Sequence, residues 1–264
     1  MKLSFSTIGC PDWSWDDITA AARDLNYDGI EIRGVGNEIY APKAKPFLAA
    51  NISKTQENLK KQGLTINCLT SGCLLNDANT EKNIDEAKDY IDLAATIGVP
   101  YVRVLGDTNP QPGEISIDFV LENLKKVVAY ASSKNVIVLM ETNGVFADSK
   151  AMAALMKNVG SDSLAVLWDV HHTYRYFNES PEETFALIGK YIKHVHIKDS
   201  KIQDGKIVYK MMGYGDVPVC QAAEVLKNGG YNGFISLEWV KRWCLELEEP
   251  GVVFAHFINY MKNC

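Results

Sequence analysis

Four side chains of types that commonly bind metal ions stand at the carboxyl ends of short apolar segments. They are Glu141, Asp169, His196 and Glu238. Short segments rich in apolar and β-branched residues are typical of buried parallel strands. A (β/α)8 barrel builds its sites from residues at the carboxyl ends of several different strands. The sequence therefore predicts parallel β-structure with a polar site at one end.

Eight candidate strands alternate with helical patterns along the 264 residues. The strands are expected at 3–7, 29–33, 65–70, 101–105, 136–141, 165–169, 194–198 and 234–238. Eight alternating units favour a closed (β/α)8 barrel over an open sheet, and that barrel typically needs about 250 residues. No G-x-G-x-x-G motif follows the first strand, so a dinucleotide-binding fold has no support. We expect one domain spanning 1–264, because no linker or shift in composition interrupts the pattern.

Several helix boundaries can be predicted from capping residues. Ser14 with Asp17, and Ser180 with Glu183, have the spacing of a capping box. Asp216 is expected to cap a helix that ends near 229–230, and a last helix is expected near 252–261. The segments 107–114 and 200–214 are expected to be loops, and the second of them could fold over the site.

Charge and composition exclude some classes of partner. The net charge of −6 disfavours nucleic acid and anionic membrane surfaces as partners. No apolar stretch approaches the roughly 20 residues of a membrane span, and the amino terminus does not resemble a signal peptide. No CxxC pair occurs, so the cysteines are expected to be free thiols of a cytoplasmic protein. They are Cys10, Cys68, Cys73, Cys220, Cys244 and Cys264.

Alternation along the strands gives the four strand-end side chains a common direction. Glu141 shares a face with Leu139, and Asp169 shares one with Leu167, so the two leucines are expected to pack beneath the site. Three carboxylates that converge would repel one another unless a cation balances them. Three acids and one imidazole suit a single Mn²⁺, Mg²⁺, Co²⁺ or Zn²⁺. The alternative is that each acid separately caps a helix or pairs with a lysine.

Other polar residues near the strand ends are candidates for substrate binding. His172 lies three residues past Asp169, and Lys198 ends the seventh candidate strand. Glu31 and Arg33 share a face of the second candidate strand and are also predicted to bind substrate. Buried charges need partners, so internal ion pairing is the alternative for these two and for Arg103.

Five motifs together resemble one known family. They are Glu-Thr-Asn at 141–143, Trp-Asp-Val-His-His at 168–172, His-Val-His-Ile-Lys-Asp at 194–199, Gly-Tyr-Gly-Asp-Val-Pro at 213–218 and Leu-Glu-Trp at 237–239. This set is similar to the xylose isomerase-like TIM-barrel family, which includes D-tagatose 3-epimerase, hydroxypyruvate isomerase and inosose dehydratase. The family usually has Gly-Glu-Gly or a similar triplet where this chain has Tyr214 between two glycines.

The resemblance implies a metal-dependent sugar or polyol isomerase or epimerase. It carries a metal-binding role to Glu141, Asp169, His196 and Glu238, and a substrate contact to His172. Glu141 and Glu238 would also exchange protons with the substrate through an enediolate. The expected partner is a small sugar or polyol. Its phosphorylation, and the choice between a monomer and a homo-oligomer, stay open.

Three other functions compete with this interpretation. A sugar or inosose dehydratase of the same fold would lose a β-hydroxyl from the same enediolate. A non-catalytic sugar-binding or regulatory protein would keep the fold with a vestigial site. An enzyme similar to endonuclease IV would need a larger, histidine-rich ligand set and DNA contacts, whereas this chain has five histidines and an acidic charge.

Overall fold

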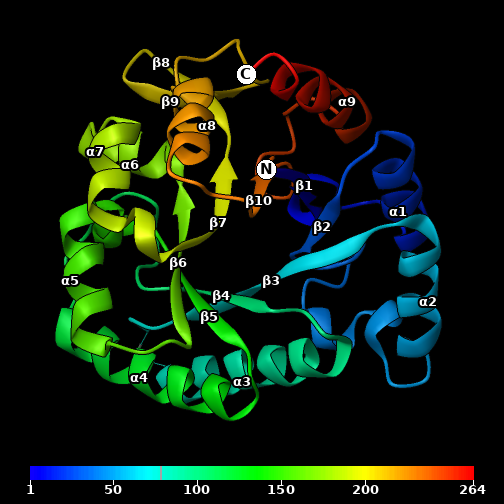
Figure 1. Cartoon of the computed structure of the whole chain (residues 1–264), viewed down its shortest axis with the longest axis horizontal. Helices are drawn as coiled ribbons and strands as arrows, with labels where there is room; N and C mark the ends of the chain where they lie inside the picture. The colour runs from blue at the N-terminus through cyan, green and yellow to red at the C-terminus, as the bar shows by residue number, and fades with distance from the viewer. Residues whose placement is uncertain (78) are drawn as a thin grey trace. The chain divides into compact units, whose positions relative to one another are not determined.

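Eight parallel strands form a closed barrel in a computed structural model that describes residues 1–77 and 79–264 (Figure 1). The hydrogen-bonded order is β1-β10-β7-β6-β5-β4-β3-β2. The strands are β1 (Lys2–Ser6), β2 (Gly29–Ile32), β3 (Thr65–Leu74), β4 (Tyr101–Leu105), β5 (Ile137–Glu141), β6 (Leu164–Asp169), β7 (Ile192–Ile197) and β10 (Phe234–Leu237). The predicted fold class is confirmed.

Helices connect these strands. They are α1 (Trp15–Asp24), α2 (Ile52–Gln62), α3 (Thr80–Ile97), α4 (Ile117–Ser133), α5 (Ser149–Val159), α6 (Val170–Phe177), α7 (Pro181–Ile188), α8 (Val219–Asn228) and α9 (Pro250–Met261). Short 3-10 turns lie at Thr7–Gly9, Ala41–Lys43, Lys45–Phe47, Gly144–Ala147 and Gly189–Tyr191. In the part of the chain that the structure describes, no helix combines the length and the apolar character needed to cross a membrane.

The local capping rules explain where most helices begin. The capping boxes predicted at Ser14 and Ser180 are both present, with hydrogen bonds between side chain and backbone in both directions. The cap predicted at Asp216 is wrong. Helix α8 begins at Val219 with Pro218 as its N-cap, because a proline disfavours the helical conformation in the residue before it, Val217.

The residues group into two compact units, 1–67 with 196–264 and 68–195. In the second unit, α3 and α4 pack outside β4 and β5 (Figure 1). A buried apolar cluster joins Leu139 and Leu167 with Cys68 and Ala165. The predicted packing of the two leucines is therefore confirmed. The prediction of one domain over 1–264 stays a prediction.

The first unit is held together by aromatic packing of α9 against β1. The rings of Phe5 and Phe254 stack with their centroids 4.2 Å apart, and both side chains are fully buried. The Tyr27 hydroxyl donates to the carbonyl oxygen of Phe254 at 2.8 Å. Burying such rings contributes about 1.5–3 kcal/mol for each side chain.

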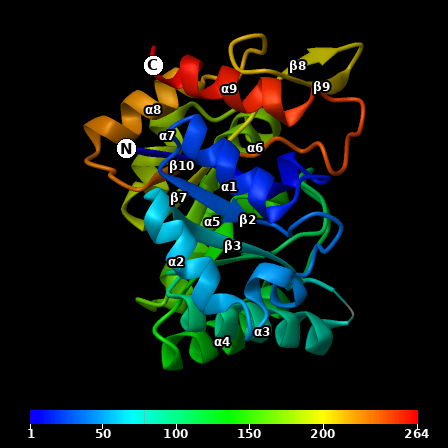
Figure 2. The same cartoon turned by 90° about the vertical axis from the view of Figure 1, so that its right-hand side faces the viewer.

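An antiparallel hairpin follows β7 where the sequence predicted only a loop. Its strands are β8 (Asp199–Gln203) and β9 (Lys206–Lys210), joined at Asp204-Gly205. Both turn residues have positive φ, 50° and 73°, which suits an Asp-Gly pair. The hairpin lies beside α9 (Figures 1 and 2). The prediction of irregular chain over 200–214 is therefore wrong for most of that segment.

A disulfide joins Cys220 of α8 to Cys264, across 44 residues of sequence and with Cα atoms 4.9 Å apart. The prediction that all six cysteines are free thiols is wrong for this pair. The spacing of the cysteines could not reveal it, because only the folded chain brings α8 beside the end of α9. Cys10, Cys68, Cys73 and Cys244 are thiols.

We expect the change Cys264→Ser to lower the free energy of unfolding by about 2–4 kcal/mol, since the disulfide restricts the unfolded chain. Urea unfolding with and without reductant measures this. Reductant should destabilise the unchanged protein and the matched variant Cys244→Ser, but should have no further effect on Cys264→Ser. Equal unfolding midpoints for all three proteins would contradict a stabilising role of the bond.

Candidate metal and substrate site

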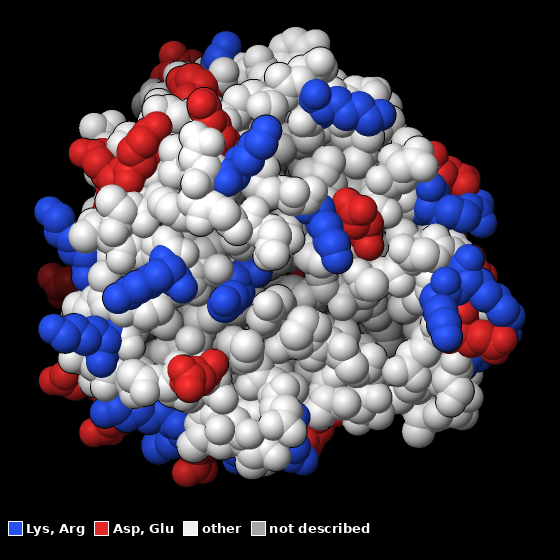
Figure 3. All heavy atoms as spheres, in the orientation of Figure 1, with Lys and Arg blue, Asp and Glu red and all other residues white. Residues whose placement is uncertain are grey.

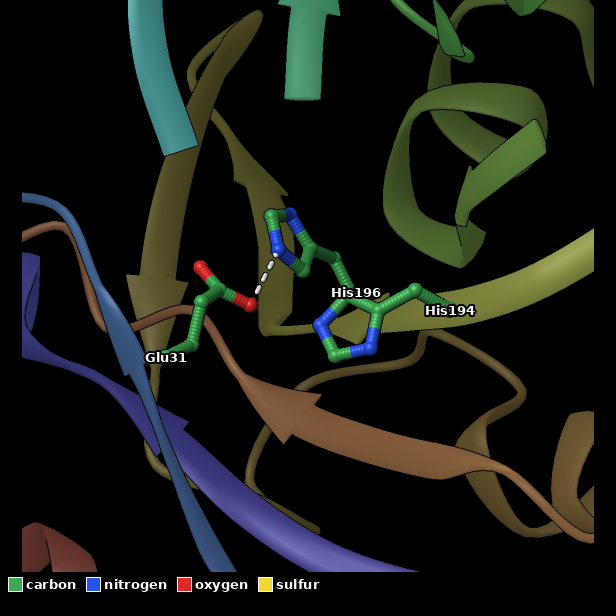
Figure 4. A group of neighbouring side chains, drawn as sticks. All are labelled: Glu31, His194 and His196. Carbon is green, nitrogen blue, oxygen red and sulfur yellow. Dashed lines mark hydrogen bonds and ion pairs between the residues drawn. The ribbon is translucent and has the colours of Figure 1, made fainter. Parts of the chain in front are cut away.

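His196 of β7 is held by a buried carboxylate from β2. Its Nε2–H donates to Oε2 of Glu31 at 2.8 Å, and both side chains are completely buried (Figure 4). An ionised carboxylate only accepts hydrogen bonds, so the proton of this bond stands on Nε2. In the neutral imidazole the lone pair is then on Nδ1. Glu31 was predicted to bind substrate, whereas the structure places it against His196.

Nδ1 of His196 faces Glu238, which directly follows β10. The distance from Nδ1 to Oε1 of Glu238 is 3.4 Å. The other oxygen, Oε2, accepts a hydrogen bond from Lys198 Nζ at 2.6 Å. Burial by itself would raise the pKa of Glu238, but the charges of Lys198 and His196 outweigh it and hold that pKa well below its usual range. Glu238 is therefore a carboxylate, the form that binds metal ions.

This pair of donor atoms fits a divalent ion. Two ligand atoms that each lie about 2.1 Å from one ion, at angles near 90–110°, are about 3.0–3.4 Å apart. The separation between His196 Nδ1 and Glu238 Oε1, 3.4 Å, matches that value. The donor chemistry, one imidazole nitrogen and one carboxylate oxygen, suits Zn²⁺ and Mn²⁺ equally.

In the other unit, Glu141 at the end of β5 pairs with Arg103 of β4. The Arg103 Nε atom lies 3.1 Å from Glu141 Oε2, and both side chains are buried. The Arg103 guanidinium also donates to the carbonyl oxygen of Ser71 at 2.9 Å. This backbone contact fixes the guanidinium, so Arg103 presents a rigid positive charge to Glu141. The expected ion pairing of Arg103 is confirmed.

Asp169 at the end of β6 caps α6 and sets the position of His172. Its Oδ1 accepts a hydrogen bond from the backbone N–H of His172 at 3.1 Å. The His172 ring then donates from Nδ1 to the carbonyl oxygen of Thr142 at 2.9 Å. A carbonyl only accepts, so the lone pair of neutral His172 is on Nε2. Asp169, His171 and His172 are all buried and present ligand atoms within 4.8 Å of one another.

These contacts answer the question of how the buried acids are balanced. Glu141 pairs with Arg103, Glu238 pairs with Lys198, and Asp169 caps a helix. These two cations offset part of the repulsion on which the sequence argument for a metal ion rested. The contacts support the alternative of individual pairing, although Glu141 pairs with an arginine and not with a lysine. The separation of His196 Nδ1 and Glu238 Oε1 is still suitable for a bound metal ion.

Two predicted substrate-binding residues have protein partners. Lys198, which is 1% exposed, forms the bond to Glu238 described above. Arg33 lies one residue past β2 and is half-buried, and its guanidinium donates to the carbonyl oxygen of Ile39 at 3.5 Å. That Lys198 and Arg33 contact a substrate stays a prediction. That Glu141, Asp169, His196 and Glu238 bind one metal ion together also stays a prediction.

Asp199 is a structural residue of this region that the sequence reasoning missed. Its carboxylate accepts hydrogen bonds from four backbone N–H groups, those of Ser200, Gly213, Gly215 and Val217. A Cβ atom at position 215 would lie 1.8 Å from Asp199 Oδ1, so only glycine fits there. The sequence pattern that could have predicted this role is an aspartate directly after Lys198, followed later by a Gly-x-Gly triplet.

Two cysteines can be set aside as nucleophiles. Burial raises the pKa of the Cys10 thiol, and burial together with the nearby Glu86 raises that of Cys73 to about 12. Reactive cysteines have lowered pKa values and are partly exposed. Both groups are therefore protonated and inert at neutral pH.

The surface charge gives no support to a nucleic-acid partner on the face that Figure 3 shows. Lysine and arginine side chains are intermixed there with aspartate and glutamate. Nucleic-acid-binding proteins instead gather positive charge in one patch or stripe. The net charge of −6 agrees with this pattern.

Comparison with known proteins places these residues in context. The chain resembles the probable 3-DHS dehydratase AsbF from Bacillus anthracis, with 18% identity, a TM-score of 0.80 and coverage of 100% of this chain and 99% of the other. The zinc-bound IolI protein is 18% identical, with a TM-score of 0.76 and coverage of 100% of this chain and 96% of the other. D-psicose 3-epimerase with D-tagatose from Clostridium cellulolyticum H10 is 16% identical, with a TM-score of 0.76 and coverage of 100% of this chain and 98% of the other. Such identities establish the fold alone. A search of curated proteins gave no match.

A family model goes further than these individual structures. The model described as xylose isomerase-like TIM barrel matches residues 19–264. This match includes all the motifs that suggested the resemblance, from Glu-Thr-Asn at 141–143 to Leu-Glu-Trp at 237–239. The chain therefore belongs to the xylose isomerase-like TIM barrel family.

Proposed function

We propose that this protein is a divalent-metal-dependent isomerase or epimerase of small sugars or polyols. The proposal depends on one observation: a buried carboxylate or imidazole stands at the carboxyl end of each of four parallel barrel strands. They are Glu141 of β5, Asp169 of β6, His196 of β7 and Glu238 after β10. Family members place their chemistry at that end of the barrel.

The four residues would hold one Mn²⁺, Mg²⁺, Co²⁺ or Zn²⁺ ion. A bound ion of this kind supplies Lewis-acid polarisation of a substrate carbonyl, which makes the neighbouring C–H more acidic. The zinc in the similar IolI structure supports a metal role. Among the ligands, His196 Nδ1 and Glu238 Oε1 already have a suitable separation, 3.4 Å.

Glu141 and Glu238 are proposed to move the proton. One carboxylate would remove the α-proton of the substrate to give an enediolate, and the other would return a proton. Return to the opposite face of the same carbon is epimerisation. Return to the neighbouring carbon is aldose–ketose isomerisation. Lys198 and Arg103 pair with the two carboxylates and hold them in place between these steps.

His172 and Lys198 are proposed to hold substrate oxygens. Neutral His172 accepts through Nε2, because its Nδ1 proton is used by Thr142. Lys198 carries three N–H donors and binds Glu238 through one of them, and we propose that it donates to a substrate hydroxyl when substrate is bound. Arg33 stays a predicted substrate contact. Phosphorylation of the substrate, the oligomeric state and a cytoplasmic location stay predictions as well.

A dehydratase is the second candidate, since a similar structure is that of a probable dehydratase. The first half of the reaction would be the same, with Glu141 or Glu238 removing the α-proton. The product would differ, because a β-hydroxyl would leave before a proton returned. A non-catalytic sugar-binding protein would bind ligand and exchange no proton.

We expect metal analysis of the purified protein to give one divalent ion per chain. Incubation in D₂O with ketohexoses, their phosphates and inososes should then show, by NMR, deuterium at the carbon next to the carbonyl of one substrate. Removal of the ion with a chelator should stop the exchange, and its return should restore it. A new alkene or deoxy product would establish the dehydratase, and ligand binding without exchange would contradict both enzymes.

A further inference from the structure

Glu31 and His196 form a fully buried hydrogen bond that the proposed reaction does not use. The two residues come from β2 and β7, which are separated in the barrel by β1 and β10. The bond therefore crosses the barrel interior (Figure 4). Ser6, in register with Glu31, and Ser236, two residues before Glu238, are small side chains on the two intervening strands. Small residues there leave room for the contact.

We infer that Glu31 is the positioning residue that fixes the tautomer and the ring orientation of His196 for metal binding. The inference rests on the proposed function, and it reassigns a residue that the sequence predicted to bind substrate. Glu31 acts through His196 and does not itself touch the metal or the substrate.

The tautomer argument follows from what each group can donate. Glu31 Oε2 lies 2.8 Å from Nε2, and an ionised carboxylate cannot supply the proton of that bond. The proton of that bond is therefore on Nε2, and Nδ1 is the nitrogen whose lone pair a metal ion would take. Metal-binding histidines commonly donate their other ring N–H to a carboxylate, which orients the ring and increases the basicity of the ligand nitrogen.

The orientation argument concerns where Nδ1 points. It faces Glu238 Oε1 at 3.4 Å, and Glu238 is itself fixed by Lys198 at 2.6 Å. Rotation of the His196 ring by half a turn would direct Nε2 away from Glu31. Both side chains are fully buried, so that bond could not be replaced by one to bulk water. Glu31 thus stabilises the one ring orientation that directs Nδ1 toward Glu238 Oε1, the other proposed ligand atom.

The change Glu31→Gln tests this role while keeping the volume of the side chain. Glutamine is neutral, so it increases the basicity of the imidazole less. Its amide can also turn and donate to His196, which permits the opposite tautomer. We expect Mn²⁺ and Zn²⁺ affinity, measured by competition with a fluorescent chelator, to fall about 10–100-fold. The control Glu183→Gln removes the same charge from the α7 capping box, where glutamine also caps, and should bind metal normally.

A second measurement uses the unchanged protein loaded with diamagnetic Zn²⁺ and so does not depend on how the variant folds. Imidazole ¹⁵N NMR, with His196 assigned by comparison with His196→Gln, should show a protonated Nε2 and a metal-bound Nδ1 that carries no proton. A proton on Nδ1 of the zinc-loaded protein would overturn the inference. So would equal metal affinity in the unchanged protein and Glu31→Gln, or a complete loss of stoichiometric binding, which would make Glu31 a direct ligand.

The two proposals fail in different ways. If the unchanged protein binds no divalent metal, the proposed function fails, and with it the metal-related role of Glu31. If the unchanged protein binds metal and exchanges substrate protons while Glu31→Gln binds metal equally well, only the positioning role fails.

Discussion

Replacing Glu238 by glutamine is expected to slow exchange of the substrate α-proton with solvent by roughly 10²–10⁴-fold, the usual contribution of a general acid or base. Glutamine keeps the shape and an oxygen that can bind the metal, but it accepts no proton. It also leaves the buried Lys198 ammonium without its ionic partner. Much of the bound metal should stay. Exchange followed by NMR in D₂O and metal analysis of the same sample measure both effects.

A matched control separates chemistry from charge. Glu249 also pairs with a lysine, Lys241, at 2.8 Å, but its side chain is 76% exposed. Glu249→Gln should therefore keep normal exchange. His172→Ala should raise KM with the metal in place, because His172 is proposed to bind substrate. Near-normal exchange in Glu238→Gln would reduce this carboxylate to a ligand, and the proton transfer would pass to Glu141 alone.

Replacing Asp169 by alanine is expected to lower divalent-metal affinity by more than the 10–100-fold that changes beside a metal ligand usually cost. It removes one of four proposed ligands. At a metal concentration 100 times the dissociation constant, the unchanged protein should gain about 2.7 kcal/mol of stability, and Asp169→Ala almost none. Thermal unfolding with and without metal, together with chelator competition, measures the difference.

Asp169 also caps α6, so its replacement has a purely structural cost of about 0.5–2 kcal/mol. Asp148→Ala is the matched control, because Asp148 caps α5 by accepting from the backbone N–H of Lys150 at 2.9 Å. It should lose similar stability and keep the full stabilisation by metal. Equal metal content in Asp169→Ala and the unchanged protein would remove Asp169 from the ligand set.

The barrel could be predicted from the sequence because its strands are buried on both faces. Such strands are near-continuous apolar segments, so all eight were found, with ends displaced by a few residues at most except at β3. The hairpin of β8 and β9 was missed for the opposite reason. Its strands are largely polar, and Ile202 is 53% exposed. The Asp204-Gly205 turn was the only available signal.

The site could be predicted only one strand at a time. Residue type and strand position identified Glu141 and Glu238, but the basic side chains that pair with them lie on other segments of the chain. Arg103 is 38 residues from Glu141, and Lys198 is 40 from Glu238. Glu31 reaches His196 across 165 residues. Periodicity of the sequence shows which residues share a face of one strand. It cannot predict contacts between residues that are far apart in the sequence, such as those across the barrel or the disulfide.

Three of the four bonds to Asp199 have a consequence for how this family could diversify. They specify the path of the segment 213–217 through the backbone N–H groups of Gly213, Gly215 and Val217, so the side chain at position 214 takes no part in them. Tyr214 is 60% exposed. Evolution, or a mutagenesis library, can therefore exchange residue 214 on an unchanged scaffold. That freedom accounts physically for a tyrosine at the position where the resemblance led us to expect a glutamate.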